Sequence, residues 1–453
     1  MKNSIDMLNG PLASKIILFA LPLLATSILQ QLFNSADSAV VGQFVSPEAL
    51  AAVGGNSPVI SLFINLFVGL SIGANAVLAM YIGENRSDKI QGAVHTIIAM
   101  SLICGVALAI IGLLFARQLL TLISVPPEVL DDATIYLQIY LAGSPFIMFY
   151  NFASAILRSK GDTRRPLLAL IASGLVNIAL NLVFVLVFHW DVAGVAWATV
   201  ISNVVSAGIV ARIMVREDEA FRLHFSQLRI EKVHLKAVLK IGLPAGIQGV
   251  LFALSNVCVQ SGINSFGSAC IAGNSASLTF EVFTYYIITA FSQSAVTFVS
   301  QNFAAGKLDR VDRVITICLV GSLVFTAIAN VLTVAFGETL MLVFTADATA
   351  LAFGMVRFYH VELLQFTMSF FEILASAMRG MGHSLAPTIV SLIGTCALRF
   401  VWMFTMFYWF EGFGMLMNVY PVTWTVTNIA MIICFFVIKK KAFAKRQTEG
   451  FHI

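Results

Sequence analysis

Long apolar runs separated by short polar stretches occupy almost the whole chain. Hydropathy predicts about twelve such runs, each long enough for a helix that crosses a bilayer, which needs about 20 apolar residues. The predicted spans are 15–44, 50–82, 92–116, 134–157, 166–189, 192–214, 238–264, 269–300, 312–337, 351–377, 386–409 and 414–438. Because little sequence remains between them, any chemistry must take place inside the membrane.

The composition excludes a water-soluble fold. Of 453 residues, 59% are hydrophobic and 11% are charged, and the mean hydropathy is +0.90, whereas soluble domains carry roughly a quarter charged residues. The net charge of +4 does not indicate nucleic-acid binding, because the Lys and Arg residues lie in short loops. We expect an all-α integral membrane protein whose partner is the lipid bilayer and not nucleic acid.

The distribution of charge across the loops predicts the orientation. Lys and Arg are frequent in the loops within 158–165, 212–236 and 307–313 and in the tail 439–453. The opposite loops carry mainly acids, with Arg117 and a second candidate, Arg357, as their bases. Because cytoplasmic loops carry the excess of Lys and Arg, both termini are expected in the cytoplasm. No small-residue cleavage site precedes the first span, so we expect no removable signal peptide.

The chain repeats itself once. The segment AILRSKGDTRRP (155–166) matches SAMRGMGHSLAP (376–387) at a constant spacing of 221 residues, and Pro22 matches Pro244 at a spacing of 222. Parallel repeats of this kind predict two halves related by an axis along the membrane normal. The expected domains are an N-terminal six-helix bundle, a cytoplasmic linker, a C-terminal six-helix bundle and a basic cytoplasmic tail: 1–214, 215–237, 238–438 and 439–453.

Ionisable residues within the predicted spans are the first candidates for function. Each costs about 2.5–3.5 kcal/mol at the centre of a spanning helix on insertion scales, so such residues are rare unless they are used. The candidates are Asp37, Glu281, Glu362, Glu372 and Arg399.

The first half offers a polar set around Asp37. Asn177 and Asn181 are spaced i, i+4 and share one helix face, and Thr199 lies in the next span. With Asp37 they would supply one anionic oxygen pair and several neutral oxygens, which suits Na⁺ or a protonatable carboxyl. Two alternatives stay open. Asp37 lies roughly 33 Å above Lys15 at about 1.5 Å per residue, which also fits an interfacial carboxylate, and Asn and Thr often join membrane helices.

Further polar residues of the first half are expected to line a substrate cavity. Gln30 and Asn34 lie on roughly the same helix face as Asp37, and Asn151 lies near the end of the fourth span. Pro22 and Pro244 each interrupt a span, and a proline inside a helix permits a bend, which makes both candidates for gating. Structural packing and tolerated kinks remain the alternatives.

The second half contains a permanent positive charge. Arg399 lies near the middle of its span and cannot lose its proton, so it needs an internal partner. Glu281 lies at comparable depth, which favours a Glu281–Arg399 pair in the substrate cavity, with Glu372 as the second choice. A purely structural ion pair between helices is the alternative interpretation.

Catalytic motifs are absent from the sequence. There is no GxxxxGK[ST] phosphate loop, no HExxH and no recognisable Ser-His-Asp order, so neither ATP hydrolysis nor proteolysis is supported. We expect no enzyme and no cofactor.

Five segments in order resemble the multidrug and toxic compound extrusion (MATE) family of bacterial type. They are the ALP of the first span, FNSADSAVVGQF around Asp37, AILRSKGDTRRP, GVAWATVIS (194–202) and SQNFAAGKLDRV (300–311). The resemblance covers nearly the whole chain. It implies two six-helix bundles around a V-shaped cavity, and a coupling cation bound at Asp37. Some relatives carry a second carboxylate at the position of Asn181, and its absence removes a charge that would favour sodium.

The function implied by this resemblance is secondary active efflux. The expected transporter exports amphipathic, often cationic, drug-like compounds in exchange for H⁺ or Na⁺ by alternating access, as a monomer in the inner (cytoplasmic) membrane. The alternative is a flippase for a lipid-linked precursor, which should have a strongly basic cavity, whereas the spans offer one predicted interior arginine. A membrane enzyme would need a paired catalytic constellation, which the sequence lacks, and an ion channel would not explain the repeated halves.

Overall fold

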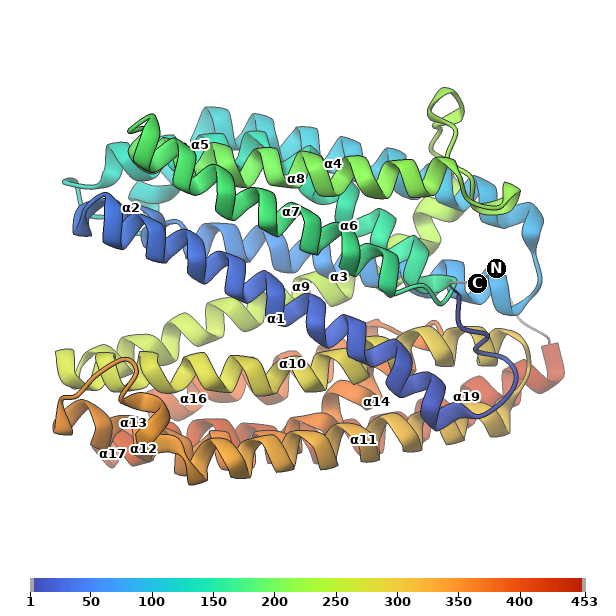
Figure 1. Ribbon diagram of the computed structural model, residues 1–453. Helices are drawn as coiled ribbons and strands as arrows, with labels where there is room; N and C mark the ends of the chain where they lie inside the picture. Colours follow the sequence, from blue (N-terminus) through green and yellow to red (C-terminus); the bar gives the residue numbers. More distant parts are fainter. Residues whose placement is uncertain (1–3, 450–453) are drawn as a thin grey trace. The chain divides into compact units, whose positions relative to one another are not determined.

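The computed structural model describes residues 4–449, and this part of the chain is helical without any strand (Figure 1). The helices of the first half are α1 (Leu12–Phe44), α2 (Pro47–Gly55), α3 (Ser57–Gly83), α4 (Ser87–Leu122), α5 (Leu130–Ala142), α6 (Ser144–Ser159), α7 (Arg164–Leu182) and α8 (Asp191–Val215). Those of the second half are α9 (Lys232–Asn264), α10 (Ser268–Ala304), α11 (Leu308–Ala335), α12 (Gly337–Met341), α13 (Ala348–His360), α14 (Met368–Gly380), α15 (Leu385–Ser391), α16 (Leu398–Phe404), α17 (Met406–Trp409), α18 (Phe413–Met417) and α19 (Val419–Glu449).

The predicted number of spans is confirmed. Within the described residues, eleven helices or joined helices are long and apolar enough to cross a membrane, and the bent pair α5–α6 makes a twelfth. This pair bends by 46° at Gly143. The bend has a local cause, since Pro145 in the first turn of α6 has no amide hydrogen to continue the helix from α5. The span predicted over 134–157 is therefore present as two helices joined at a bend.

Three other predicted spans contain short non-α turns. The span over 351–377 consists of α13, the 3-10 turn Glu362–Thr367 and α14. The span over 386–409 contains the π-helical turn Leu392–Ala397, and α7 likewise runs into a π-helical turn, Val183–Val187. Single π turns inside α-helices are frequent at functional sites. Both π turns lie two residues from a candidate, one after Asn181 and the other before Arg399.

Contacts divide the chain into two compact units. One comprises residues 25–242 with the short segment before Met7, and the other comprises residues 7–24 and 243–449. The boundary between the two units falls inside α1, two residues after Pro22, and again inside α9, two residues before Pro244. The first helix of each half thus contributes residues to both units, and the boundaries do not fall within the linker 215–237.

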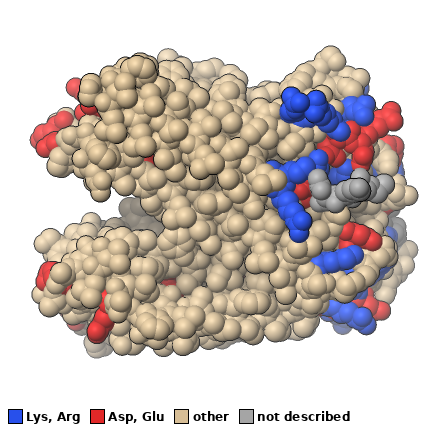
Figure 2. Space-filling view, in the orientation of Figure 1, with Lys and Arg blue, Asp and Glu red and all other residues tan. Residues whose placement is uncertain are grey.

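Packing within each unit is helix on helix. In the first unit α4 packs against α5 and α6, and α7 packs against α8, while in the second unit α10 packs against α11, α13 and α14. Large apolar side chains such as Leu114 and Leu332 point outward, as expected where lipid is the solvent. In each unit taken by itself, Lys and Arg gather at one end of the helices in Figure 2, and the other end shows acidic residues.

The linker docks on the first unit through charged groups. Lys160 donates to the carboxylates of Glu217 (2.6 Å) and Asp218 (2.5 Å), and Arg165 pairs with Asp162 and Glu217. Glu217 is buried. The hydrogen bond and the charge of Lys160 hold the pKa of Asp218 below its ordinary value. The beginning of the linker is therefore part of the folded unit and not only a solvated connector.

Candidate functional site

The first unit assembles the polar set predicted around Asp37. The Asn181 amide donates to Asp37 Oδ1 at 2.5 Å, and the Thr199 hydroxyl donates to Asp37 Oδ2 at 3.1 Å. Asn177 completes the set, since it accepts from Asn181 and donates to Thr199, both at 3.4 Å. All four side chains that we predicted to act together are in one hydrogen-bonded cluster.

Three helices position this cluster. Asp37 lies on α1, Asn177 and Asn181 lie one turn apart on α7, and Thr199 lies on α8, which packs along α7. Asp37 is only 7% exposed, so it is not the interfacial carboxylate that the sequence left open. Val41 and Val195 lie one turn from the cluster, in an apolar group that keeps water away from that side.

The cluster presents one carboxylate among neutral hydrogen-bonding side chains. Asp37 supplies the one carboxylate, and its two oxygens receive N–H and O–H donors that stabilise the charged form. The Asn181 Oδ1 atom is buried and has no partner in the described structure. Because the oxygen and nitrogen of an amide exchange places by a simple flip, rotation of Asn181 would turn this free acceptor toward Asp37. A proton or a monovalent cation bound at Asp37 would then find an additional oxygen.

The other predicted residues of the first half do not join this cluster. Asn151 donates to the Ile147 carbonyl of its own helix at 2.9 Å. Gln30 and Asn34 are exposed on α1, and neither is hydrogen-bonded to Asp37 in the described part of the chain. Their role in lining a substrate cavity stays a prediction, as does the gating role of Pro22 and Pro244.

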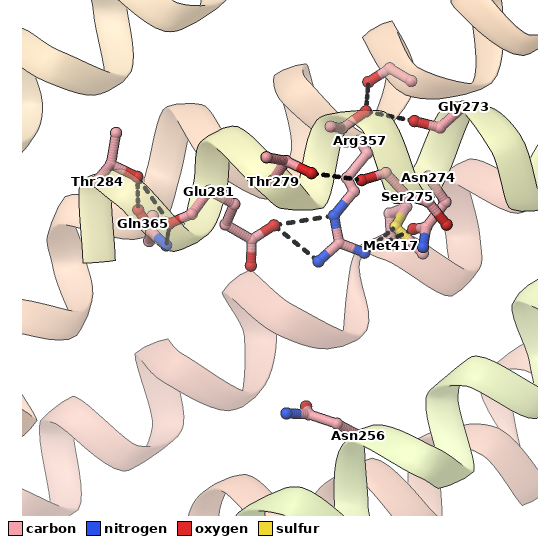
Figure 3. Close-up of polar contacts among 12 residues, drawn as sticks. Asn256, Gly273, Asn274, Ser275, Thr279, Glu281, Thr284, Arg357, Gln365 and Met417 are labelled. Carbon is pink, nitrogen blue, oxygen red and sulfur yellow. Dashed lines mark hydrogen bonds and ion pairs between the residues drawn. The ribbon is translucent and has the colours of Figure 1, made fainter. Parts of the chain in front are cut away.

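The second unit contains a different ion pair from the one predicted. Glu281 on α10 accepts from Arg357 on α13, at 2.9 Å from Nε and 2.7 Å from Nη2, and the Asn274 amide oxygen accepts from the same guanidinium at 2.7 Å. Figure 3 shows the carboxylate and the guanidinium facing each other across the two helices. The predicted Glu281–Arg399 pair is thus wrong.

The error came from placing Arg357 in an outer loop. Arg357 is 2% exposed and lies in the last turn of α13, immediately before the chain turns into the 3-10 segment at Glu362. Hydropathy placed it near the edge of a span, where a charge costs little. The signal that the sequence offers for this contact is the pair of small residues Gly273 on α10 and Gly354 on α13, because they allow the two helices to approach closely.

Arg399 is bound elsewhere in the second unit. Its Nη1 atom donates to the Asn256 amide oxygen of α9 at 2.6 Å. Its guanidinium lies over the Tyr420 ring at 4.7 Å, and Arg357 lies at 5.1 Å from the same ring. In the close-up, Asn256 stands apart from the Glu281–Arg357 pair (Figure 3). Glu372, the second choice as a partner, instead accepts from the Tyr285 hydroxyl at 3.3 Å.

Glu362 is an isolated carboxyl in the same unit. It is fully buried, and neither of its side-chain oxygens has a hydrogen-bond partner in the described structure. No three His, Cys, Asp or Glu side chains among residues 4–449 lie close enough together to hold a metal ion.

Comparisons with known proteins give one consistent result. The family model MatE matches residues 22–183 and again residues 244–405, so the two matches begin at Pro22 and Pro244. The chain is 27% identical over 389 residues to the probable multidrug resistance protein YoeA of Bacillus subtilis, which covers 83% of this chain and 82% of that protein. It is 25% identical over 403 residues to the probable multidrug resistance protein NorM of Thermotoga maritima, covering 88% and 86%.

The fold has solved counterparts. A structure described as the outward-facing conformation of a multidrug resistance MATE family transporter of the MOP superfamily superposes with a TM-score of 0.88 over 98% of both chains. The sequence identity to that chain is 22%, so this likeness shows the common fold.

Proposed function

Because the chain belongs to the MatE family of multidrug efflux transporters, we propose that it is a secondary antiporter that exchanges amphipathic, often cationic compounds for H⁺ or Na⁺. Alternating access would expose the bound ligands first to one side of the membrane and then to the other. The multi-pass protein would lie in the inner membrane with both termini in the cytoplasm and act as a monomer.

The observation that carries this proposal is the buried carboxylate of Asp37 among neutral hydrogen-bonding groups. Three polar side chains hold its position, and none of them carries a charge. A carboxylate without a resident counter-ion is poised to bind a proton or a sodium ion from one side and to release it to the other.

Competition for one negative charge explains how the two fluxes are coupled. A proton or sodium ion at Asp37 neutralises the carboxylate and removes the attraction that a cationic drug would feel. Coupling is reciprocal by linkage, so a bound cationic drug weakens binding of the ion to the same degree. When the carrier changes conformation only with one of the two ligands bound, ligands that exclude each other are carried in opposite directions, which is antiport.

The test is release of the cationic dye rhodamine 123 from proteoliposomes under an inward sodium gradient alone and under an inward proton gradient alone. We expect one of the gradients to accelerate release and Asp37→Asn to abolish that acceleration. Asp131→Asn is the matched control, since Asp131 pairs with Arg117 on the surface with its side chain 78% exposed. The proposal would be refuted if neither gradient changed the rate of dye release, or if a gradient still accelerated release by the Asp37→Asn protein.

A flippase for a lipid-linked precursor remains the second candidate, and Arg357 is the observation that bears on it. The second unit buries three arginines, Arg357, Arg379 and Arg399, whereas the sequence predicted one interior arginine. Glu281 neutralises Arg357, however, so the unit does not offer the strongly basic surface that a pyrophosphate group would need. Drug efflux therefore stays the better supported function.

A further inference from the structure

The second unit holds more buried positive charge than its ion pairs neutralise. Arg357 is bound by Glu281 through two nitrogens. Arg399 is only 3% exposed, and its one hydrogen-bond partner in the described structure is the neutral amide oxygen of Asn256. The ring of Tyr420 covers one face of the guanidinium. Asn256 and Tyr420 orient the Arg399 guanidinium, but they bring no negative charge to it.

A buried guanidinium normally has a carboxylate or a similar anion beside it. Its charge is permanent, and burying a charge without a counter-charge is costly. The nearby carboxylates do not meet this need. Glu281 is engaged by Arg357, and Glu362 makes no salt bridge within the described residues. The charge of Arg399 is therefore available to an external anion.

The unoccupied side of Arg399 has the geometry for a carboxylate. Nη1 donates to Asn256, while Nε is buried without a partner, and Nη2 makes no hydrogen bond to any described residue. Nε and Nη2 lie along one edge of the guanidinium and point two parallel N–H bonds at the two oxygens of a carboxylate. Arg379 is also buried and its Nε also lacks a partner, but its Nη2 donates to Gln248, so it does not offer the same pair of N–H groups.

The Nε end of this edge is fully buried, whereas Nη2, which also has no described partner, keeps some contact with solvent. The Asn256 side chain is exposed, so Arg399 lies directly beneath a surface residue of the second unit. The π-helical turn Leu392–Ala397 ends two residues before Arg399 and sets its position on the helix. Such turns shift the side chains that follow them and are common where a ligand binds.

We propose that the Nε–Nη2 edge of Arg399 binds a carboxylate group of the exported compound. The inference rests on the proposed function and adds a recognition site for compounds that bear a carboxylate. Besides purely cationic compounds, the transporter would carry molecules that bear a carboxylate, including zwitterions. Arg357 would not take part, because Glu281 already occupies its corresponding edge.

The experiment compares two dyes that share one cationic ring system. Rhodamine 110 carries a free carboxylate where rhodamine 123 carries its methyl ester. Binding of each dye to the purified full-length protein would be measured by fluorescence anisotropy, and release of each dye would be followed in proteoliposomes. The first variant is Asn256→Asp, which keeps Arg399 and places an internal carboxylate within hydrogen-bond distance of it.

We expect Asn256→Asp to weaken binding of rhodamine 110 roughly tenfold or more, equivalent to about 1.4 kcal/mol, and to change rhodamine 123 binding less than about twofold. Arg399→Gln should show the same selectivity, and Arg399→Lys should retain part of the rhodamine 110 affinity. Asn264→Asp is the matched control, since Asn264 is exposed on the same helix and accepts only from Gln260. This control should leave both dyes unchanged.

Three results would overturn the inference. They are rhodamine 110 binding that is unchanged in both Asn256→Asp and Arg399→Gln, an equal loss of binding for both dyes, and binding of both dyes that changes when chloride is replaced by methanesulfonate. The last result would mean that Arg399 binds an inorganic anion. Because Asn256→Asp adds an ion pair, the melting temperature of this variant should not fall below that of the wild type. If neither dye is released in any gradient, the proposed function fails, while the binding data still decide the role of Arg399.

Discussion

At the scale of single residues, Asn181 is the position that should decide between sodium and protons. Its amide lies 2.5 Å from Asp37 Oδ1. Asn181→Asp would place two carboxylates in contact, and two such groups cannot both stay ionised unless a cation lies between them. We expect the variant to bind sodium more tightly and to make dye release more dependent on a sodium gradient. Sodium-dependent thermal stabilisation of the purified protein measures this directly, and a variant that sodium does not stabilise would contradict the expectation.

The Arg357–Glu281 pair should behave as a buried ion pair. Arg357→Met leaves Glu281 without its partner, which costs roughly 3–5 kcal/mol when a buried pair is broken from one side. The double change Arg357→Met with Glu281→Gln removes both charges and should recover much of that stability. Thermal melting of Arg357→Met, Glu281→Gln and the double variant gives the coupling free energy between the two charges.

The exposed pair Arg117–Asp131 serves as the control for this cycle. Its side chains are 59% and 78% exposed, so breaking it should cost only about 0–1 kcal/mol. Additive effects at Arg357 and Glu281 would mean that the two charges do not stabilise each other.

The two halves of the site differ in how far the sequence could predict them. Asn177 and Asn181 share a helix face by spacing alone, and Asp37 and Thr199 lie in segments with a recognisable pattern. The contact of Arg357 with Glu281 joins α10 and α13 across 76 residues and depends on where α13 ends, which hydropathy cannot resolve. For the same reason the sequence paired Glu281 with the wrong arginine.

At the scale of helices, the close approach of α10 and α13 should be sensitive to one methyl group. A Cβ atom on Gly273 would lie 2.0 Å from the backbone oxygen of Ala350, and neither atom is on a flexible side chain. We expect Gly273→Ala to push the two helices apart and to destabilise the protein by about 1–3 kcal/mol, the usual cost of overpacking. The Arg357–Glu281 pair spans the same interface and would weaken with it.

Gly208 on α8 provides the matched control. A Cβ atom there meets nothing within 4 Å, so Gly208→Ala should be neutral or stabilise the helix by roughly 0.5–1 kcal/mol. Melting temperatures of the two variants in one detergent compare the sites. Equal stability of both variants would show that α10 and α13 are less tightly packed than the structure indicates.

At the scale of the whole molecule, the number of helices and their repetition followed from simple physics. Apolar runs of spanning length give the helices, and the constant spacing of the repeat gives two copies of one arrangement, which the two family matches starting at Pro22 and Pro244 confirm. The sequence could not predict that α1 and α9 each contribute residues to both units. Both helices are continuous apolar segments, and nothing in their pattern says which neighbours each end will contact.

The charge inventory of the molecule predicts how export responds to the membrane potential. A potential of 100 mV supplies about 2.3 kcal/mol per elementary charge moved, equivalent to roughly a 50-fold gradient, but only if net charge crosses the membrane. Glu281 is paired with Arg357 and is not free to bind a cation. Asp37 should therefore carry a single monovalent cation inward. Exchange for one molecule of rhodamine 123 then moves no net charge, whereas exchange for zwitterionic rhodamine 110 moves one positive charge inward.

In proteoliposomes whose potential is set by potassium and valinomycin, we therefore expect an inside-negative potential to accelerate release of rhodamine 110 and to leave release of rhodamine 123 unchanged. The ion gradients are held fixed, and Asp131→Asn is measured alongside as a surface control. A steep response of rhodamine 123 would mean that two cations enter for each dye molecule. The second cation would then need another carboxylate, and the buried, unbonded Glu362 would be the residue to replace by Gln. Loss of the voltage response in Glu362→Gln would identify Glu362 as the second coupling site. Glu281 is not the alternative as long as its ion pair with Arg357 stays intact.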